Sequence, residues 1–268
     1  MRTLDGAVVV VLGAGSIGDG WGNGRACAYA YAREGAAVVC ADLHAERAQA
    51  TVDAIREFGG IAAVTTADAT DEAAVQAVID FAVERFGRLD VVHCNVGIGG
   101  STGAPDVIPR AAWDREFAIN ATSTYLAIRC AVPVMRAQGG GVITTTSSIL
   151  AARYMRNPSV AYTASKAAVE AMTRACALAY GPDNIRVNCI RIGFSETPLL
   201  QLGLEARGMD EAQQLDAMDR SRRKVPLRHE HTDPFDVANT AVFLASAKAR
   251  NITGVVLNVD GGLEHAPL

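Results

Sequence analysis

Short apolar runs alternate along the chain with longer segments whose apolar residues recur at helical spacing. The apolar runs occupy residues 7–12, 37–41, 62–66, 89–94, 141–146, 185–190 and 255–259. The helical patterns cover residues 25–34, 45–58, 72–86, 113–138, 161–180 and 235–245. Polar and apolar residues do not alternate within the apolar runs, which is typical of strands buried on both faces. The pattern therefore predicts right-handed strand–helix–strand units and a parallel sheet with helices on both faces.

One segment departs from this alternation, between the run that ends near residue 190 and the helix that begins near residue 235. A long excursion of this kind in a compact domain usually has a function. The composition does not change along the chain in a way that marks an internal boundary. We therefore expect a single domain over residues 1–268.

The net charge of −4 and the hydrophobic fraction of 50% describe a chain that can bury a large core. A slightly acidic surface does not attract nucleic acid or an anionic membrane. No apolar run reaches the roughly 20 residues that span a bilayer, and residues 1–13 do not resemble a cleavable leader. We expect a cytoplasmic protein with no nucleic-acid or membrane partner.

Neither the six cysteines nor the five histidines show the spacing of a metal site. The cysteines lie among apolar or small residues and form no C-x-x-C pair; they are Cys27, Cys40, Cys94, Cys130, Cys176 and Cys189. We expect buried, reduced thiols and no metal site.

Residues 12–26, LGAGSIGDGWGNGRA, hold six glycines directly after the first apolar run. Gly13, Gly15 and Gly18 match the G-x-G-x-x-G fingerprint of a dinucleotide site literally. A helix that began within this match would contain several glycines, each of which costs about 1 kcal/mol relative to alanine. A helix that begins at Gly24 continues instead into RACAYAYARE, which is rich in helix-forming residues.

Asp42 ends the second apolar run, where an acidic residue about 20 positions after the fingerprint binds the adenosine ribose. It lies 18 residues after Gly24 and 24 residues after Gly18, so the spacing favours the later helix start. We infer that Gly13 makes the turn out of the strand. Gly22 and Gly24 then let the backbone approach the pyrophosphate at the helix N-terminus. Together these features predict a Rossmann-type, doubly wound α/β fold that binds a nucleotide.

Further motifs match a known family in order and in position. L-G followed by G-N-G resembles its T-G-x-x-x-G-x-G motif with a loop five residues longer, C-N-V-G resembles its N-N-A-G, and Y-T-A-S-K is its Y-x-x-x-K. The chain resembles the short-chain dehydrogenase/reductase family over nearly its full length. The resemblance implies the catalytic residues Asn120, Ser148, Tyr162 and Lys166. Taken with the spacing argument, it implies cofactor contacts at Gly13, Gly22, Asn23, Gly24, Asp42, Asp68, Asn95, Gly97, Tyr162, Lys166, Gly193 and Thr197.

Two departures from the family pattern affect the site. Ile192 stands before Gly193, where the family has a proline. The gap between the serine and Tyr162 is one residue longer than usual, so either Ser147 or Ser148 can face the substrate. We favour Ser148.

Tyr162 and Lys166 are four residues apart and therefore share one face of a helix. A free tyrosine has a pKa of about 10 and is a poor base at neutral pH. A neighbouring ammonium and a positively charged nicotinamide both favour the phenolate, so we expect Tyr162 to take the hydroxyl proton as hydride leaves the substrate. The resemblance implies that Ser148 holds the substrate oxygen and that Asn120 supports a proton path to Lys166.

Asp42 also bears on the choice of cofactor, because a carboxylate accepts hydrogen bonds from ribose hydroxyls and repels a 2′-phosphate. No arginine follows it directly, so we expect NAD rather than NADP. The expected function is hydride transfer between NAD and a secondary alcohol or its ketone. A ketoreductase of the 3-oxoacyl reductase type and a catalytically silent NAD-binding sensor are the alternatives.

The resemblance implies that the excursion forms a substrate lid over residues 194–233. The cations of this segment, together with Arg153 and Arg156 before Tyr162, are expected at the surface or at a subunit contact. The alternative for the two arginines is to hold an anionic substrate group. The helix after Tyr162 is apolar on more than one side, and the family commonly pairs this helix between subunits. We therefore expect a homotetramer, with a dimer as the alternative.

Overall fold

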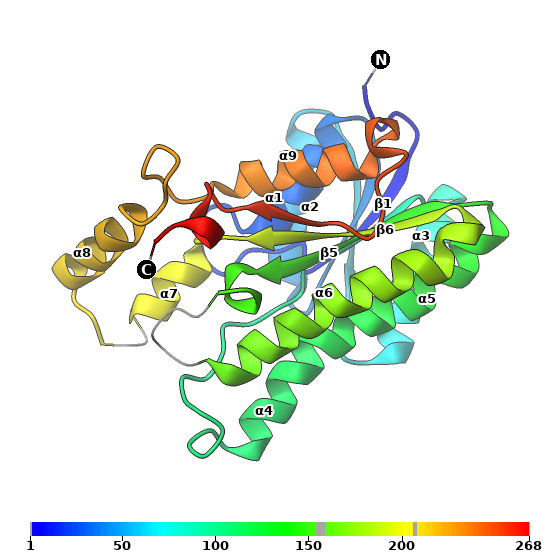
Figure 1. Ribbon diagram of the computed structural model, residues 1–268. Helices are drawn as coiled ribbons and strands as arrows, with labels where there is room; N and C mark the ends of the chain where they lie inside the picture. Colours follow the sequence, from blue (N-terminus) through cyan, green and yellow to red (C-terminus); the bar gives the residue numbers. More distant parts are fainter. Residues whose placement is uncertain (1, 154–158, 206–207, 268) are drawn as a thin grey trace.

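Seven strands form one sheet in the order β3-β2-β1-β4-β5-β6-β7, and every pairing is parallel (Figure 1). The computed structural model describes residues 2–153, 159–205 and 208–267. The strands are β1 (Val8–Leu12), β2 (Ala37–Asp42), β3 (Ile61–Thr66), β4 (Val91–Cys94), β5 (Gly141–Ser148), β6 (Ile185–Ile192) and β7 (Val256–Val259).

Helices cover both faces of this sheet. They are α1 (Asn23–Arg33), α2 (Ala45–Glu57), α3 (Glu72–Phe86), α4 (Arg110–Phe117), α5 (Ser123–Ala137), α6 (Val160–Tyr180), α7 (Pro198–Glu205), α8 (Glu211–Arg222) and α9 (Pro234–Ala245). Figure 1 shows α1, α2 and α9 on one side of the sheet and α3, α5 and α6 on the other. A large cluster of buried apolar residues lies on each side, so the expected doubly wound fold is confirmed.

The structure differs from the sequence expectation in the ends of some elements. β5 and β6 run two residues further than expected, to Ser148 and Ile192. The helical region expected over residues 113–138 is present and begins at Arg110, but a π-helical turn at Ala118–Thr122, which the sequence did not predict, divides it into α4 and α5. Asn120 lies within this turn, and π-helical turns are frequent at functional sites.

The strand order reverses between β1 and β4, since β2 and β3 continue on one side of β1 and the later strands continue beyond β4. Leu12 and Cys94, the last residues of these two strands, are register partners. Doubly wound sheets bind ligands at such a reversal, outside the carboxyl ends of the strands. Figure 1 shows α7 and α8 beyond the carboxyl ends of β5 and β6, so the excursion between β6 and α9 lies at the same edge.

All six cysteines are free thiols, and all except the half-buried Cys176 are buried. Burial raises the pKa of Cys94 to about 12, which keeps this thiol protonated and unreactive. No helix among the described residues has the length and apolar character needed to cross a membrane. In the same part of the chain, His, Cys, Asp and Glu side chains form no group that could hold a metal ion.

His93 is a fully buried histidine near the end of β4. The hydroxyl of Tyr31 lies 3.1 Å from its Nδ1. Burial lowers the pKa of His93 to about 4, compared with about 6.5 for an exposed histidine. The folded chain therefore keeps this imidazole neutral at pH values where the unfolded chain protonates it.

We expect acid to destabilise the fold through His93. Because the pKa is lower in the folded state, stability is lost as the pH falls from about 6.5 to about 4, and the full loss is about 3 kcal/mol. Urea unfolding should show a free energy of unfolding about 2 kcal/mol lower at about pH 5 than at about pH 7.5. His93→Asn should flatten this difference, whereas substitution of the exposed His44 by Gln should not. An equal pH slope in the wild type and in His93→Asn would contradict the assignment.

Candidate active site

The turn from β1 into α1 requires two glycines. Gly13 has a φ of +79°, a left-handed conformation that glycine adopts without strain. A Cβ on Gly24 would overlap the carbonyl oxygen of Gly13 and lie 2.5 Å from Nδ2 of Asn95, which donates a hydrogen bond to that carbonyl (3.1 Å). The first turn of α1 therefore packs on the end of β1. Glycine at position 24 is therefore also required by packing within the chain, in addition to the pyrophosphate approach expected from the sequence.

The N-terminus of α1 has the features of a phosphate site. α1 begins at Asn23 and its N-cap is Gly22, which offers no side-chain cap. The backbone N–H groups of its first turn therefore face water or a ligand. A hollow of about 230 Å³ adjoins the loop and is lined by Ser16, Gly18, Asp19, Arg25, Glu46, Arg47 and Ala50. Within it, Oγ of Ser16 and Nε of Arg25 are buried and have no hydrogen-bond partner among the described residues. A helix N-terminus, a hydroxyl and a cation together fit a dinucleotide phosphate.

The additional residues of the glycine loop are held by Trp21. Its ring meets Tyr29 and Phe235 edge to face, with centroids 5.0 Å apart in each case. The guanidinium of Arg25 lies 4.7 Å from the ring centroid, within the range of a cation–π interaction. The longer loop is thus anchored against α1 and α9.

Asp42 ends β2 beside the glycine loop. Its carboxylate accepts hydrogen bonds from the backbone N–H groups of Gly15 (3.0 Å) and His44 (3.1 Å). These bonds hold the carboxylate at the strand end, where an adenosine ribose binds in folds of this type. Asp68 is exposed after β3, and the hydroxyl and N–H of Thr70 both donate to its carboxylate, which lowers the pKa of Asp68.

Asn120 joins the segment after β4 to α6. It is fully buried, accepts a hydrogen bond from the N–H of Ile98 (2.8 Å) and donates one to the hydroxyl of Ser165 (3.2 Å). Gly97 lies beside it, because a Cβ at that position would be 3.0 Å from Nζ of Lys166 and 3.3 Å from Oδ1 of Asn120. The structure therefore brings Gly97, Asn120 and Lys166 together, although they are far apart in the sequence.

Ser148, Tyr162 and Lys166 meet at the carboxyl end of β5. Ser148 lies close enough to Tyr162 for its hydroxyl to lower the pKa of the phenol. Nζ of Lys166 lies 6.0 Å from the centroid of the Tyr162 ring and donates to the carbonyl oxygen of Thr146 (3.1 Å). Ser147 is buried and its hydroxyl donates to the backbone carbonyl of Lys166 (3.2 Å). Ser148 is therefore the serine that faces Tyr162.

The groups of the chain by themselves raise the pKa of Tyr162, whereas the lowered value expected from the sequence also includes the positive charge of a bound nicotinamide. Burial is the largest cause, the hydroxyl of Ser148 lowers the pKa, and the carboxylate of Glu116 raises it. Burial also lowers the pKa of Lys166 to about 8. At the observed separation the ammonium therefore does not offset the loss of hydration around the phenol.

The segment after β6 reaches back to the glycine loop. The hydroxyl of Ser195 donates to Oδ1 of Asn23 (3.1 Å). Gly193 packs against the backbone of Asp260, since a Cβ on this glycine would lie 2.8 Å from Cα of Asp260. Thr197 directly precedes α7. These contacts join the start of α1 to the start of α7 at one edge of the site.

A polar cluster ties α8 to the same segment. The carboxylate of Glu196 accepts a hydrogen bond from Nε of Arg222 (2.7 Å) and lies 3.3 Å from Nδ1 of His231. Nε2 of His231 is 2.7 Å from the hydroxyl of Ser221. Arg222 was expected on a solvated face, but it connects α8 to the residues that enter α7.

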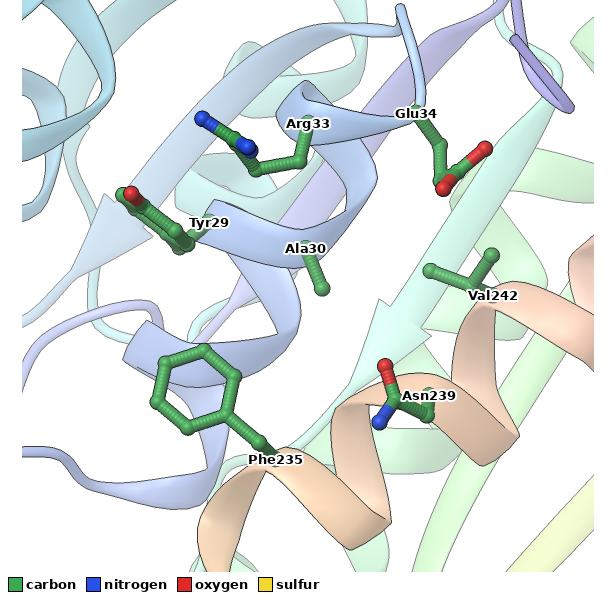
Figure 2. Close-up of a pocket in the computed structure, with 7 residues that line it drawn as sticks. All are labelled: Tyr29, Ala30, Arg33, Glu34, Phe235, Asn239 and Val242. Atoms are coloured by element: carbon green, nitrogen blue, oxygen red, sulfur yellow. The ribbon is translucent and has the colours of Figure 1, made fainter. Parts of the chain in front are cut away.

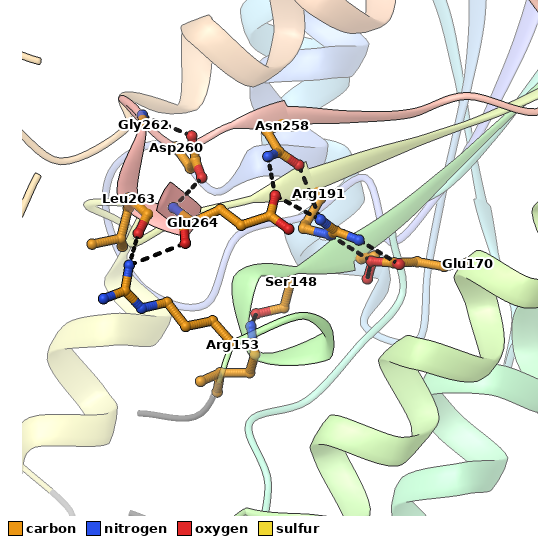
Figure 3. A network of polar contacts seen from close by, with 11 residues as sticks. Ser148, Arg153, Glu170, Arg191, Asn258, Asp260, Gly262, Leu263 and Glu264 are labelled. Carbon is orange, nitrogen blue, oxygen red and sulfur yellow. Dashed lines mark hydrogen bonds and ion pairs between the residues drawn. The ribbon is translucent and has the colours of Figure 1, made fainter. Parts of the chain in front are cut away.

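A second polar network lies near the carboxyl ends of β5 and β6 (Figure 3). Arg191 on β6 pairs with Glu170 on α6 (2.7 Å) and with Glu264 (2.8 Å). The hydroxyl of Ser147 donates to Oε1 of Glu170 (2.9 Å). The side chains of Arg191 and Glu170 are only 12% and 5% exposed, so breaking this pair would leave a buried charge without a partner.

Arg153 holds residues 263–267 beside the segment that follows β5. Its guanidinium donates to the backbone carbonyl oxygens of Leu263 and Glu264 (Figure 3), and to that of Pro267. Arg153 is therefore engaged with the chain's own backbone rather than directed to an anionic substrate group. Arg156 lies outside the described residues.

Another hollow, of about 170 Å³, lies between α1 and α9 (Figure 2). Its lining residues are Tyr29, Ala30, Arg33, Glu34, Phe235, Asn239 and Val242. Tyr162 and Lys166 lie on α6, on the other side of the sheet. This hollow is therefore not part of the candidate active site.

The sequence analysis missed Glu116 and Ser195. Glu116 is 2% exposed and its charge acts on Tyr162, and Ser195 binds the start of α1. A single acid on a helix and a single serine in a loop belong to no motif whose spacing in the sequence would mark them as functional. Glu116 directly follows Asp114 and Arg115, so its neighbours in the sequence gave no indication of burial.

Known proteins resemble the chain over almost all of its length. A model of the enoyl-(acyl carrier protein) reductase family matches residues 18–264. The 7α-hydroxysteroid dehydrogenase of Escherichia coli K12 is 34% identical over 259 residues, which cover 97% of this chain and 94% of that protein. The cis-4-hydroxycyclohexanecarboxylate dehydrogenase of Sinomonas cyclohexanicum is 38% identical over 256 residues, 95% of each chain. A solved structure of 7α-hydroxysteroid dehydrogenase with NADH and 7-oxo glycochenodeoxycholic acid has a TM-score of 0.85 and 33% identity, and the match covers 97% of this chain and 94% of that one.

Proposed function

Because the chain belongs to the short-chain dehydrogenase/reductase family and is an oxidoreductase, we propose that it oxidises a secondary alcohol on a saturated ring, with NAD as the cofactor. The observation that carries this proposal is the meeting of Ser148, Tyr162 and Lys166 at the strand edge that also carries the glycine loop. The relatives support the substrate class, because a 7α-hydroxysteroid and a 4-hydroxycyclohexanecarboxylate both carry the hydroxyl on a saturated ring.

The residues around the glycine loop fit a nicotinamide dinucleotide. The ones we propose to hold it are Gly13, Gly22, Asn23, Gly24, Asp42, Asp68, Asn95, Gly97, Tyr162, Lys166, Gly193 and Thr197. Ser16 and Arg25 add polar atoms without partners among the described residues beside the first turn of α1. When bound, NAD supplies a hydride acceptor and a further positive charge in the site.

In the proposed reaction the phenolate of Tyr162 takes the proton of the substrate hydroxyl as the carbonyl forms. The hydroxyl of Ser148, which lies close to Tyr162, holds the substrate oxygen and stabilises its developing charge. Lys166 adds an ammonium on the same helix face, and Asn120 fixes the adjoining backbone through Ile98. In the reverse direction Tyr162 returns the proton to the alcohol.

We propose that residues 194–233 form the substrate lid. α7 and α8 occupy this segment beyond the strand ends (Figure 1). A bridge between Ser195 and Thr232 holds its two ends together, and the Glu196–Arg222 pair ties the end of α8 to the start of the segment. Leu199 and Leu202 on α7 are each 42% exposed, which gives the segment apolar surface suited to a hydrocarbon ring.

The proposal is tested by following NADH absorbance with a panel of alcohols. We expect the chain to oxidise cyclohexanol and a 7α-hydroxysteroid faster than an open-chain secondary alcohol of similar size. Binding of NAD without oxidation of any alcohol would favour the silent sensor. A much faster reduction of a 3-oxoacyl thioester would favour the ketoreductase.

Asp42→Asn is expected to weaken NAD and improve NADP. The amide keeps one oxygen for the N–H of Gly15 but removes the charge that repels a 2′-phosphate. Loss of a charged hydrogen bond to the ribose corresponds to a loss in NAD affinity of about 10-fold or more. Titrations with NAD and with NADP measure the change. Both titrations are needed because Arg25 and Arg47 line the hollow beside the glycine loop. A wild type that binds NADP as tightly as NAD would contradict the cofactor assignment.

We propose a homotetramer that pairs α5 and α6 between subunits. Leu178 on α6 is 83% exposed and Tyr125 on α5 is 48% exposed, so both helices present apolar area for a partner subunit to cover. Light scattering distinguishes the tetramer from a dimer. Leu178→Glu should reduce the mass, and an unchanged mass would exclude this face from the interface.

A further inference from the structure

Glu116 is a buried acid one helical turn before Asn120. It lies on α4 and is only 2% exposed. Its Oε1 accepts hydrogen bonds from the backbone N–H (2.5 Å) and the hydroxyl (2.6 Å) of Ser101. Burying a carboxylate is costly unless such bonds compensate it, so the two bonds from Ser101 make this position tolerable. They also hold the segment that follows β4.

Gly100 brings the carboxylate close to the candidate base. A Cβ on Gly100 would lie 2.6 Å from Cβ of Tyr162 and would overlap Oε2 of Glu116. Gly100 therefore lies between Glu116 and Tyr162, and the side chains of these two residues pack against its Cα. The structure thus places a fixed negative charge beside the first turn of α6.

Three groups of the described chain act on Tyr162 from the elements around it. Lys166 comes from α6, Ser148 from the end of β5 and Glu116 from α4. The ammonium and the hydroxyl of Ser148 favour the phenolate, whereas a neighbouring carboxylate opposes a second negative charge. The opposition is felt strongly where little water separates the groups, and the carboxylate of Glu116 indeed raises the pKa of Tyr162.

We propose that Glu116 is a positioning residue that holds residues 97–101 against Tyr162 and, through its charge, sets the pH at which this phenol ionises. The proposal rests on the proposed function of Tyr162 as the base. Glu116 adds to the effect of burial, which keeps the phenol protonated before the positively charged cofactor binds. The base then forms only in the complex that can use it.

Glu116→Gln removes the negative charge and keeps the hydrogen bonds, because the amide oxygen can still accept from the N–H and the hydroxyl of Ser101. We expect the pH profile of kcat/KM for alcohol oxidation to move to lower pH by about 0.5 to 1 unit. Absorbance titration of the phenol, taken as the difference from Tyr162→Phe, should show the same shift without turnover. Asp114→Asn is the matched control, because Asp114 is an exposed acid on the same helix.

Ser101→Ala tests the holding role by itself. It removes one of the two hydrogen bonds and keeps the charge, so we expect a higher KM or lower kcat with an unchanged pH midpoint. If Glu116→Gln does not fold, Glu116→Met removes the charge at similar volume. A midpoint that shifts no further in the Glu116 variant than in Asp114→Asn overturns the role of the charge.

The experiments distinguish a failure of the proposed function from a failure of the further inference. If Tyr162→Phe keeps its turnover, Tyr162 is not the base, and the absorbance titration still reports whether Glu116 controls its ionisation. If Tyr162→Phe is inactive and the phenol titrates identically in the wild type and in folded Glu116→Gln, the further inference is wrong and the proposed function stands.

Discussion

Tyr162→Phe is expected to remove most of the turnover and leave cofactor binding intact. General acid–base catalysis contributes about 10²- to 10⁴-fold, so kcat should fall by at least about 100-fold. The ring that packs beside Gly100 and Lys166 remains in place, and the substitution removes only the ionisable hydroxyl. Single-turnover kinetics and NAD titration measure the two effects independently.

Tyr180→Phe provides the control for this substitution. Tyr180 is also half-buried and ends the same helix, α6, but it lies far along that helix from Ser148. Its loss of a hydroxyl should leave kcat unchanged within about twofold. Comparable activity in Tyr162→Phe and Tyr180→Phe would remove Tyr162 from the mechanism.

Gly24→Ala is expected to have the largest effect on the fold. The added methyl group would overlap the carbonyl oxygen of Gly13, and a backbone atom at a strand end cannot rotate away as a side chain can. Overpacking typically costs about 1–3 kcal/mol, and we expect at least the upper end of this range. The melting temperature measures the cost, and NAD affinity is compared only on protein that remains folded.

Gly22→Ala and Gly18→Ala separate cofactor contact from packing. A Cβ on Gly22 meets first the side-chain oxygen of Ser16, at 3.3 Å, so stability should change little while NAD affinity falls by about 10-fold or more. Gly18 has a φ of +76° and open space around it, so alanine there should cost about 1 kcal/mol in strain and no affinity. Affinity lost at Gly18 and kept at Gly22 would make the literal fingerprint the working one.

The sheet was predictable because its strands are buried on both faces. Val8–Leu12 is apolar throughout, and a continuous apolar run needs no knowledge of its neighbours to be recognised. The π-helical turn at Ala118–Thr122 was not predictable in this way. Its sequence suits a helix, and Asn120 within it is bonded to Ile98, a residue of a distant loop.

The candidate site was predictable where the role of a residue depends on its spacing from another residue in the sequence. Tyr162 and Lys166 share a helix face, and Asp42 lies at a fixed distance from the glycines. The buried position of Glu116 and the bond between Ser195 and Asn23 depend on how distant segments pack. The raised pKa of Tyr162 could not be predicted for the same reason, since burial is its main cause.

The contacts of Arg153 and Arg191 impose an order on the biosynthesis of the site. A ribosome delivers β1 and its glycine loop early, and nascent domains begin to fold from the N-terminal side. Within the described part of the chain, however, Arg153 finds acceptors in residues 263–267, and Arg191 bonds with Glu170, Asn258 and Glu264. Until those late residues emerge, Arg153 has none of its three backbone acceptors, and the segment after Ser148 lacks its support. The segment after Ser148 therefore gains this support only when the C-terminal residues have left the ribosome.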